Sequence, residues 1–156
     1  AIAGSIATLG LEAVRYPGFL LGFMPGNLPE LMGVLLLDQF ATGPTMASSL
    51  AGFAYHFLNG ASFGIVFVIL AEIGLVRERP SWTVGYGILI GVGFMLSPVV
   101  ESLGVGFFGL DFGWSFAATV TMAHAIFGVA LGGLLRAFRT KPLNSPSRWS
   151  ARQVAA

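Results

Sequence analysis

Cysteine is absent from the 156-residue chain, so disulfides, thiolate metal sites and cysteine nucleophiles are all excluded. Charge is almost as scarce, because Asp, Glu, Lys and Arg make up 10% of the residues, whereas a soluble domain carries about 25%. The formal net charge is only +1, and no basic patch is interleaved with aromatic residues as in nucleic-acid-binding proteins. The composition therefore favours neither a soluble domain nor a nucleic-acid partner.

Hydrophobic residues make up 55% of the chain and gather in runs of the length that a bilayer requires. A helix needs about 20 mostly apolar residues to cross the hydrocarbon core. Such runs are present at 2–24, 47–72, 83–103 and 115–136. They predict an all-α membrane protein with four transmembrane helices in one domain, residues 1–136, followed by a polar tail, residues 137–156.

Lysine and arginine are missing from two of the connections, 25–46 and 104–114. The cationic residues lie instead between the second and third runs and after the fourth: Arg77, Arg79, Arg136, Arg139, Lys141, Arg148 and Arg152. Cytoplasmic loops of membrane proteins carry an excess of Lys and Arg. The pattern therefore predicts that loop 73–82, the tail and both termini are cytoplasmic, and that the two connections without cations face outward.

Prolines mark helix boundaries within this plan. In the first outward connection Asn27 precedes Pro29 and Glu30, an order typical of a helix start, and leucines follow at helical spacing. The segment is too short to cross a bilayer, so we expect a short helix lying in the outer interface. Pro17 and Pro98 sit late in the first and third runs, and each is expected to kink or end its helix.

The chain contains an internal repeat built around its two histidines. The stretches "HFLNGASFG" at 56–64 and "HAIFGVALG" at 124–132 both read His-x-x-x-Gly-x-x-x-Gly. A second offset matches the first run to the third, pairing Gly4 with Gly85, Gly10 with Gly91 and Pro17 with Pro98. We interpret the chain as two hairpins of the same topology, about 1–72 and 83–136, related by an axis along the membrane normal, as in parallel-repeat transporters.

His56 and His124 each stand above two residues without side chains, because positions four apart share one helix face. Gly60 and Gly128 can then admit a neighbouring helix closely, while the imidazoles hydrogen-bond inside the bundle. The alternative is that the two histidines hold a haem b or a chlorophyll-type pigment, with these glycines flanking the macrocycle. No metal site is predicted, since two imidazoles without nearby carboxylates or thiolates are too few ligands for a transition metal.

Three further polar residues lie inside the apolar runs. Glu12 and Arg15 are one turn apart, which brings their side chains together, and intramembrane charges are costly unless paired. We therefore expect a local ion pair facing the bundle; the alternative is a proton or ion relay between Glu12 and a histidine. Asn59, one turn from His56, is expected to hydrogen-bond another helix.

Three stretches resemble a family of small bacterial inner-membrane proteins known mainly as a domain of unknown function. They are "GSIATLGLEAVRYPGFL", "YHFLNGASFGIVF" and "AHAIFGVALGGLL". The resemblance implies a four-helix fold in the bacterial inner (cytoplasmic) membrane, with the histidine and glycine frame recurring in the second and last spans. The family has no established activity, so the resemblance assigns no site residue.

No Ser-His-Asp spacing, metalloprotease motif or phosphate-binding loop appears, so no catalytic residue is assigned and no enzymatic activity is expected. The small size and the abundant small residues favour an accessory or assembly subunit of a larger membrane complex. Its partners would be the lipid bilayer and other membrane subunits. Two alternatives stay open. One is a haem- or pigment-binding electron-transfer subunit using His56 and His124. The other is a small oligomeric channel or transporter with Glu12, Arg15 and the two histidines along a polar path.

Overall fold

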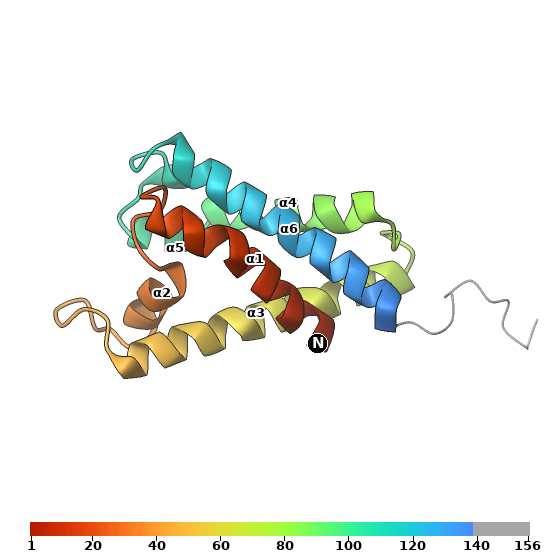
Figure 1. Ribbon diagram of the computed structural model, residues 1–156, viewed down its shortest axis with the longest axis horizontal. Coiled ribbons are helices and arrows are strands. Elements are labelled where there is room, and N and C mark those ends of the chain that lie inside the picture. Colours follow the sequence, from red (N-terminus) through yellow and green to blue (C-terminus); the bar gives the residue numbers. More distant parts are fainter. Residues whose placement is uncertain (139–156) are drawn as a thin grey trace, which may run out of the picture.

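The computed structural model describes residues 1–138, and every regular element within them is a helix (Figure 1). The predicted all-α class is confirmed. The elements are α1 (Ile2–Leu20), α2 (Leu28–Leu36), α3 (Met46–Glu72), α4 (Pro80–Met95), α5 (Pro98–Ser102), the 3₁₀ turn η1 (Phe107–Gly109) and α6 (Trp114–Phe138).

Two helices form the centre of the molecule and two others flank them. α1 and α6 pack side by side through the middle, α3 packs on α1, and α4 packs on α6 (Figure 1). The short α2 packs on the first half of α3. Of the described helices, α3 and α4 do not pack along each other, so the outer pair stands apart.

Two of the helices, α3 and α6, are long and apolar enough to cross a membrane. α3 has 27 residues and α6 has 25, and they coincide with the runs predicted at 47–72 and 115–136. α6 reaches Phe138, so the first residues of the predicted tail, 137–156, are helical. Residues 139–156 lie outside the described part of the chain, and four of the cations used to orient the tail lie there: Arg139, Lys141, Arg148 and Arg152.

The third apolar run does not form one continuous helix, contrary to the span predicted at 83–103. α4 ends at Met95 after 16 residues, and the short α5 begins at Pro98. Proline has no backbone N–H and disfavours helical backbone in the residue before it. Ser97 is accordingly extended, with φ −80° and ψ 150°. The expectation that Pro98 interrupts its helix is confirmed.

The first run is also shorter than predicted, because α1 ends at Leu20 and not at residue 24. Pro17 lies inside the helix, which continues past it. The chain turns at Gly22, whose φ of 76° is a left-handed backbone conformation that glycine adopts without steric cost. This turn leads the chain back toward α2.

α2 is the short helix that the sequence predicts after Asn27. Pro29 occupies its first turn together with Glu30, where a missing N–H costs nothing and an acidic side chain is favourable. Gly33 of α2 lies directly on the α3 backbone near Gly52, so a Cβ at either position would overlap the other helix. The close approach of α2 to α3 depends on these two glycines.

α1 meets α3 at a contact between glycines. Gly4 of α1 lies so close to Gly60 that a Cβ on Gly4 would overlap the Gly60 carbonyl oxygen. One turn further along α3, a Cβ on Gly64 would lie 2.9 Å from the Gly4 Cα. Small residues allow helix backbones to approach in this way, so the first His-Gly-Gly frame packs on α1 through its glycines.

The second frame packs on α4 by the same means. A Cβ on Gly128 would overlap the Thr83 carbonyl oxygen, and a Cβ on Gly87 would overlap the His124 carbonyl oxygen. Gly132 lies against the Thr83 side chain. Gly60 and Gly128 therefore both lie at tight helix contacts, as their spacing predicts.

Two glycines that match in sequence between the first and third runs have different surroundings in the structure. Gly4 is buried against α3, whereas its predicted counterpart Gly85 is exposed, with no heavy atom within 4 Å of a Cβ. Thr83 takes the contact with the glycine frame of α6 in its place. The two matched glycines therefore differ in their packing, because α4 presents a different side to α6.

The glycine contacts generate a first prediction. Gly128→Leu should lower the unfolding free energy by at least roughly 1–3 kcal/mol, the usual cost of overpacking, because the new side chain meets α4 backbone. Gly133→Leu is the matched control on the same helix, since no heavy atom lies within 4 Å of a Cβ there. Denaturation of both variants in detergent measures the difference; equal stability would contradict the described contact.

Candidate functional site

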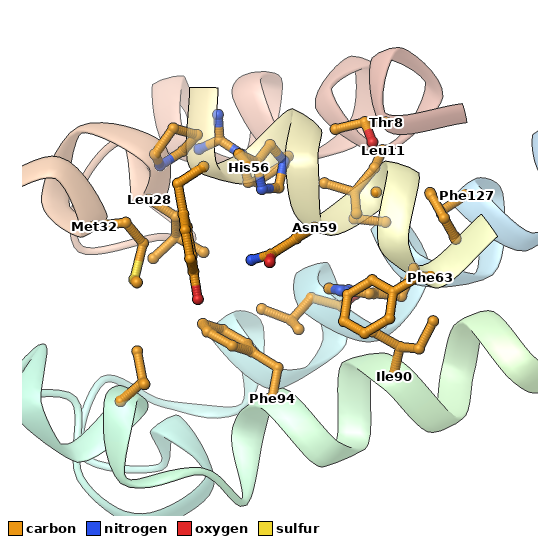
Figure 2. A pocket seen from close by; sticks show the side chains of 18 of the residues that line it. Thr8, Leu11, Leu28, Met32, His56, Asn59, Phe63, Ile90, Phe94 and Phe127 are labelled. Carbon is orange, nitrogen blue, oxygen red and sulfur yellow. The ribbon is translucent and has the colours of Figure 1, made fainter. Parts of the chain in front are cut away.

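The space between α3 and α4 holds a cavity of about 460 Å³. Side chains of α1, α2 and α6 complete its walls, and Val99 of α5 borders one end. Figure 2 shows Asn59 of α3 and Phe94 of α4 reaching into it from the two sides. Its volume falls within the range of about 300–1,000 Å³ typical of small-molecule sites.

A buried arginine forms part of the cavity wall. Arg15 is 2% exposed, and its Nε donates a hydrogen bond of 2.9 Å to Glu12 Oε1. Its Nη2 pairs with the second Glu12 oxygen and donates to Asn27 Oδ1 at 2.9 Å. Nη1 is buried without a hydrogen-bond partner among the described residues. The expected ion pair between Glu12 and Arg15 is confirmed, and one donor group is left over.

His56 joins this pair from α3. Its Nε2 lies 2.7 Å from Glu12 Oε1, close enough for an ion pair when the ring is protonated. Glu12 therefore stands between Arg15 on its own helix and His56 on the next. The expectation that Glu12 is the acidic neighbour of an inward-facing histidine is confirmed for His56.

His124 lines the same cavity from α6 but has a different partner. Its Nδ1 lies 2.9 Å from the Val120 carbonyl oxygen. A carbonyl oxygen only accepts, so Nδ1 carries the hydrogen and Nε2 of the neutral ring is left as an acceptor. Gly91 of α4 lies against this ring, and no acidic side chain among the described residues contacts His124 as Glu12 contacts His56. The repeated histidines are thus chemically different.

Asn59 was expected to bond another helix, and the structure corrects this. The amide makes no hydrogen bond within residues 1–138 and extends into the cavity (Figure 2). Tyr55, one turn away on α3, lines the cavity as well and is 37% exposed. The free amide is therefore a hydrogen-bonding group directed at a space that apolar side chains otherwise surround.

The glycines predicted to flank a macrocycle lie in different places. Gly60 borders the cavity as well as α1. Gly128 lies against the α4 backbone instead. A macrocycle held by both histidines needs both Nε2 atoms as ligands, and that of His56 faces Glu12. The cofactor role of these residues stays a prediction that this arrangement does not favour.

Two helices present hydrogen-bonding groups to the cavity. The Asn59 amide offers donors from α3, and His124 Nε2 offers an acceptor from α6. Aromatic rings form much of the remaining wall, among them Phe63, Phe94 and Phe127. Within residues 1–138 no three His, Asp or Glu side chains gather as a metal site would require. An amphiphilic molecule of moderate size is the ligand that such a site fits.

The sequence reveals only part of this site. Helical spacing predicts the contact between Glu12 and Arg15, whereas the bond from Arg15 to Asn27 depends on how the chain turns back after α1. The chain matches no known family, no curated protein and no solved structure. The resemblance to small bacterial inner-membrane proteins therefore stays a prediction.

The buried pair generates a second prediction. Glu12→Gln leaves the Arg15 charge buried without its counter-ion, so it should cost about 3–5 kcal/mol of unfolding free energy. The double variant with Arg15→Gln should recover part of that loss, because no charge remains buried. Glu101→Gln, on an exposed side chain of α5, is the control. Denaturation curves measure the unfolding free energy of each variant. A double variant less stable than Glu12→Gln would contradict the buried ion pair as the cause of the loss.

Proposed function

We propose that the chain is an integral membrane protein, an accessory subunit without catalysis of its own, whose central cavity binds a lipid-soluble ligand. The exposure of α3 supports membrane insertion. Only 17% of the most apolar stretch of α3 is buried within the bundle, and large side chains such as Leu58, Ile65 and Ile69 are exposed. Apolar surfaces of that extent are typical of membrane or protein contacts.

The proposed topology has four spans and two parallel hairpins, with both termini in the cytoplasm of a bacterial cell. α3 and α6 supply two complete spans by length. α4 alone is short of the about 20 residues needed, and the bent continuation through α5 extends it toward the same outer side. The cation-bearing loop between α3 and α4 contains Arg77 and Arg79, which favours the cytoplasmic side.

The position of the cavity opening carries the ligand-binding proposal. Tyr86 of α4 joins the two outer helices at one end by donating to the Phe63 carbonyl oxygen at 2.9 Å. Beyond that bridge α3 and α4 diverge, and the cavity reaches the surface beside Tyr55 and Gly93, which are both exposed. In a membrane this side of the bundle faces lipid, so a ligand would enter sideways from the bilayer.

The rival roles fit the cavity less well. A two-histidine haem or pigment site conflicts with the contact between His56 and Glu12. A channel or transporter needs a continuous polar path, whereas Leu11, Ile90 and Phe127 are among the many apolar side chains of the cavity wall. An accessory subunit that delivers or holds a membrane-soluble molecule for a partner subunit needs neither feature.

The opening generates a third prediction. Gly93 lines the cavity, yet no heavy atom lies within 4 Å of a Cβ there, so Gly93→Trp should fill the mouth without disturbing the fold. Gly85→Trp is the matched control, two turns away on α4 and equally open. Saturable binding of radiolabelled decylbenzene to the purified protein should fall at least about tenfold only in Gly93→Trp, a loss of about 1.4 kcal/mol. Equal binding by both variants, or none by the unaltered chain, would overturn the proposal.

A further inference from the structure

On the described cavity wall the one permanent charge already has its counter-ion. Among the described residues that line it, Arg15 is the only one with a permanent charge, and Glu12 neutralises that charge through two contacts. An anionic headgroup near Arg15 would meet a guanidinium that is already paired and would be repelled by the neighbouring Glu12 carboxylate. The arrangement therefore favours a neutral polar group over a carboxylate or phosphate.

The hydrogen-bonding groups around the cavity define where that neutral ligand carries its polar atoms. The Asn59 amide, which makes no hydrogen bond within residues 1–138, supplies donors from α3. An acceptor oxygen on the ligand would pair with it, and a neutral hydrogen bond of this kind contributes about 0.5–1.5 kcal/mol.

The acceptor lies on a different wall. Because Nδ1 of His124 is committed to the Val120 carbonyl oxygen at 2.9 Å, the neutral ring presents Nε2 as an acceptor from α6. A hydroxyl group on the ligand would satisfy it. The ligand thus needs oxygens on two of its edges, at least one of them a hydroxyl.

The apolar part of the cavity indicates what lies between those oxygens. Phe63, Phe94 and Phe127 come from three different helices and line the space together with Tyr55. Aromatic rings pack well against one another in offset or edge-to-face arrangements. A flat ring fits such walls, and an attached alkyl chain can leave through the opening beside Gly93 into the lipid.

We infer that the cavity binds a hydroquinone-type headgroup, a neutral ring with two opposed oxygens and an apolar chain. The Asn59 amide donates to one ring oxygen, and His124 Nε2 accepts from the hydroxyl on the other edge. This inference rests on the proposed function, because it requires the ligand-binding cavity to open to lipid. It adds the chemical class of the ligand and the residues that distinguish it from an ordinary hydrocarbon.

A pair of probes that differ only in oxygen tests the inference. Decylhydroquinone, kept reduced, carries the two hydroxyls, and decylbenzene has the same ring and chain without them. Native mass spectrometry of the detergent-solubilised protein gives the dissociation constant of each probe. The unaltered chain should prefer decylhydroquinone by at least about tenfold, because only that probe can form hydrogen bonds with Asn59 and His124.

Two variants and a matched control assign the preference to the cavity. Asn59→Leu and His124→Phe should each reduce it to about threefold or less, since each removes one hydrogen-bonding group. Ser62→Leu makes the same kind of change on the exposed side of α3, where Ser62 bonds only the Leu58 carbonyl oxygen, and should leave the preference intact. Measuring all variants in the same micelles cancels the partition of each probe into detergent, and either cavity variant alone suffices if the other fails to fold.

The possible outcomes distinguish a failure of the hydroquinone assignment from a failure of the proposed function. Equal affinity for the two probes, or a preference that survives both cavity variants, overturns the hydroquinone assignment while the binding of decylbenzene still supports a lipid-open cavity. Failure of both probes to bind overturns the assignment and the proposed function together.

Discussion

Glycine allows α1 to approach α3, and α6 to approach α4, until backbone touches backbone, and the positions of the other elements follow from these two contacts. At Gly4 with Gly60 and at Gly87 with Gly128 a single Cβ would force the helices apart. In lipid, helices gain no hydrophobic energy by associating, so close van der Waals packing of this kind is what holds them together. Each glycine pair fixes an outer helix to a central one.

Fixing the outer helices to the centre leaves them without a long contact to each other. α3 and α4 are bridged where Tyr86 donates to Phe63, and the Tyr86 ring lies 5.2 Å from that of Phe67. Away from that bridge the same two helices form the walls of the cavity. The buried Arg15 and His56 form part of the cavity wall, and Glu12 contacts both of them. In our account tight packing on one side of each helix pair thus creates the binding space on the other.

The sequence predicts the elements better than it predicts their relations. Apolar length identifies α3 and α6, and the Asn-x-Pro-Glu order identifies α2, because these signals are local. The sequence predicts that Pro98 kinks or ends its helix. It does not predict that the third run is thereby divided into α4 and the short α5. The different packing of Gly4 and Gly85 shows that a sequence match between glycines does not fix their contacts, since the helix face in contact depends on the neighbouring helix.

The site shows the same division between local and tertiary information. Spacing along one helix predicts that Glu12 meets Arg15 and that both histidines lie above glycine pairs. It does not predict that Asn59 stays unbonded or that Asn27 binds Arg15, because these depend on how separate helices and turns come together. The different partners of His56 and His124 likewise follow from Glu12 on α1 and Gly91 on α4, residues that the repeat itself does not relate.

The central claim is that the gap between α3 and α4 opens to lipid. Nitroxide labels attached at residues 55 and 93, on a chain that has no cysteine of its own, test it most directly in reconstituted bilayers. Collision rates with oxygen, which concentrates in lipid, should far exceed those with a water-soluble nickel complex at both positions. Dominant collisions with the nickel complex at both would place the opening in water and contradict the account.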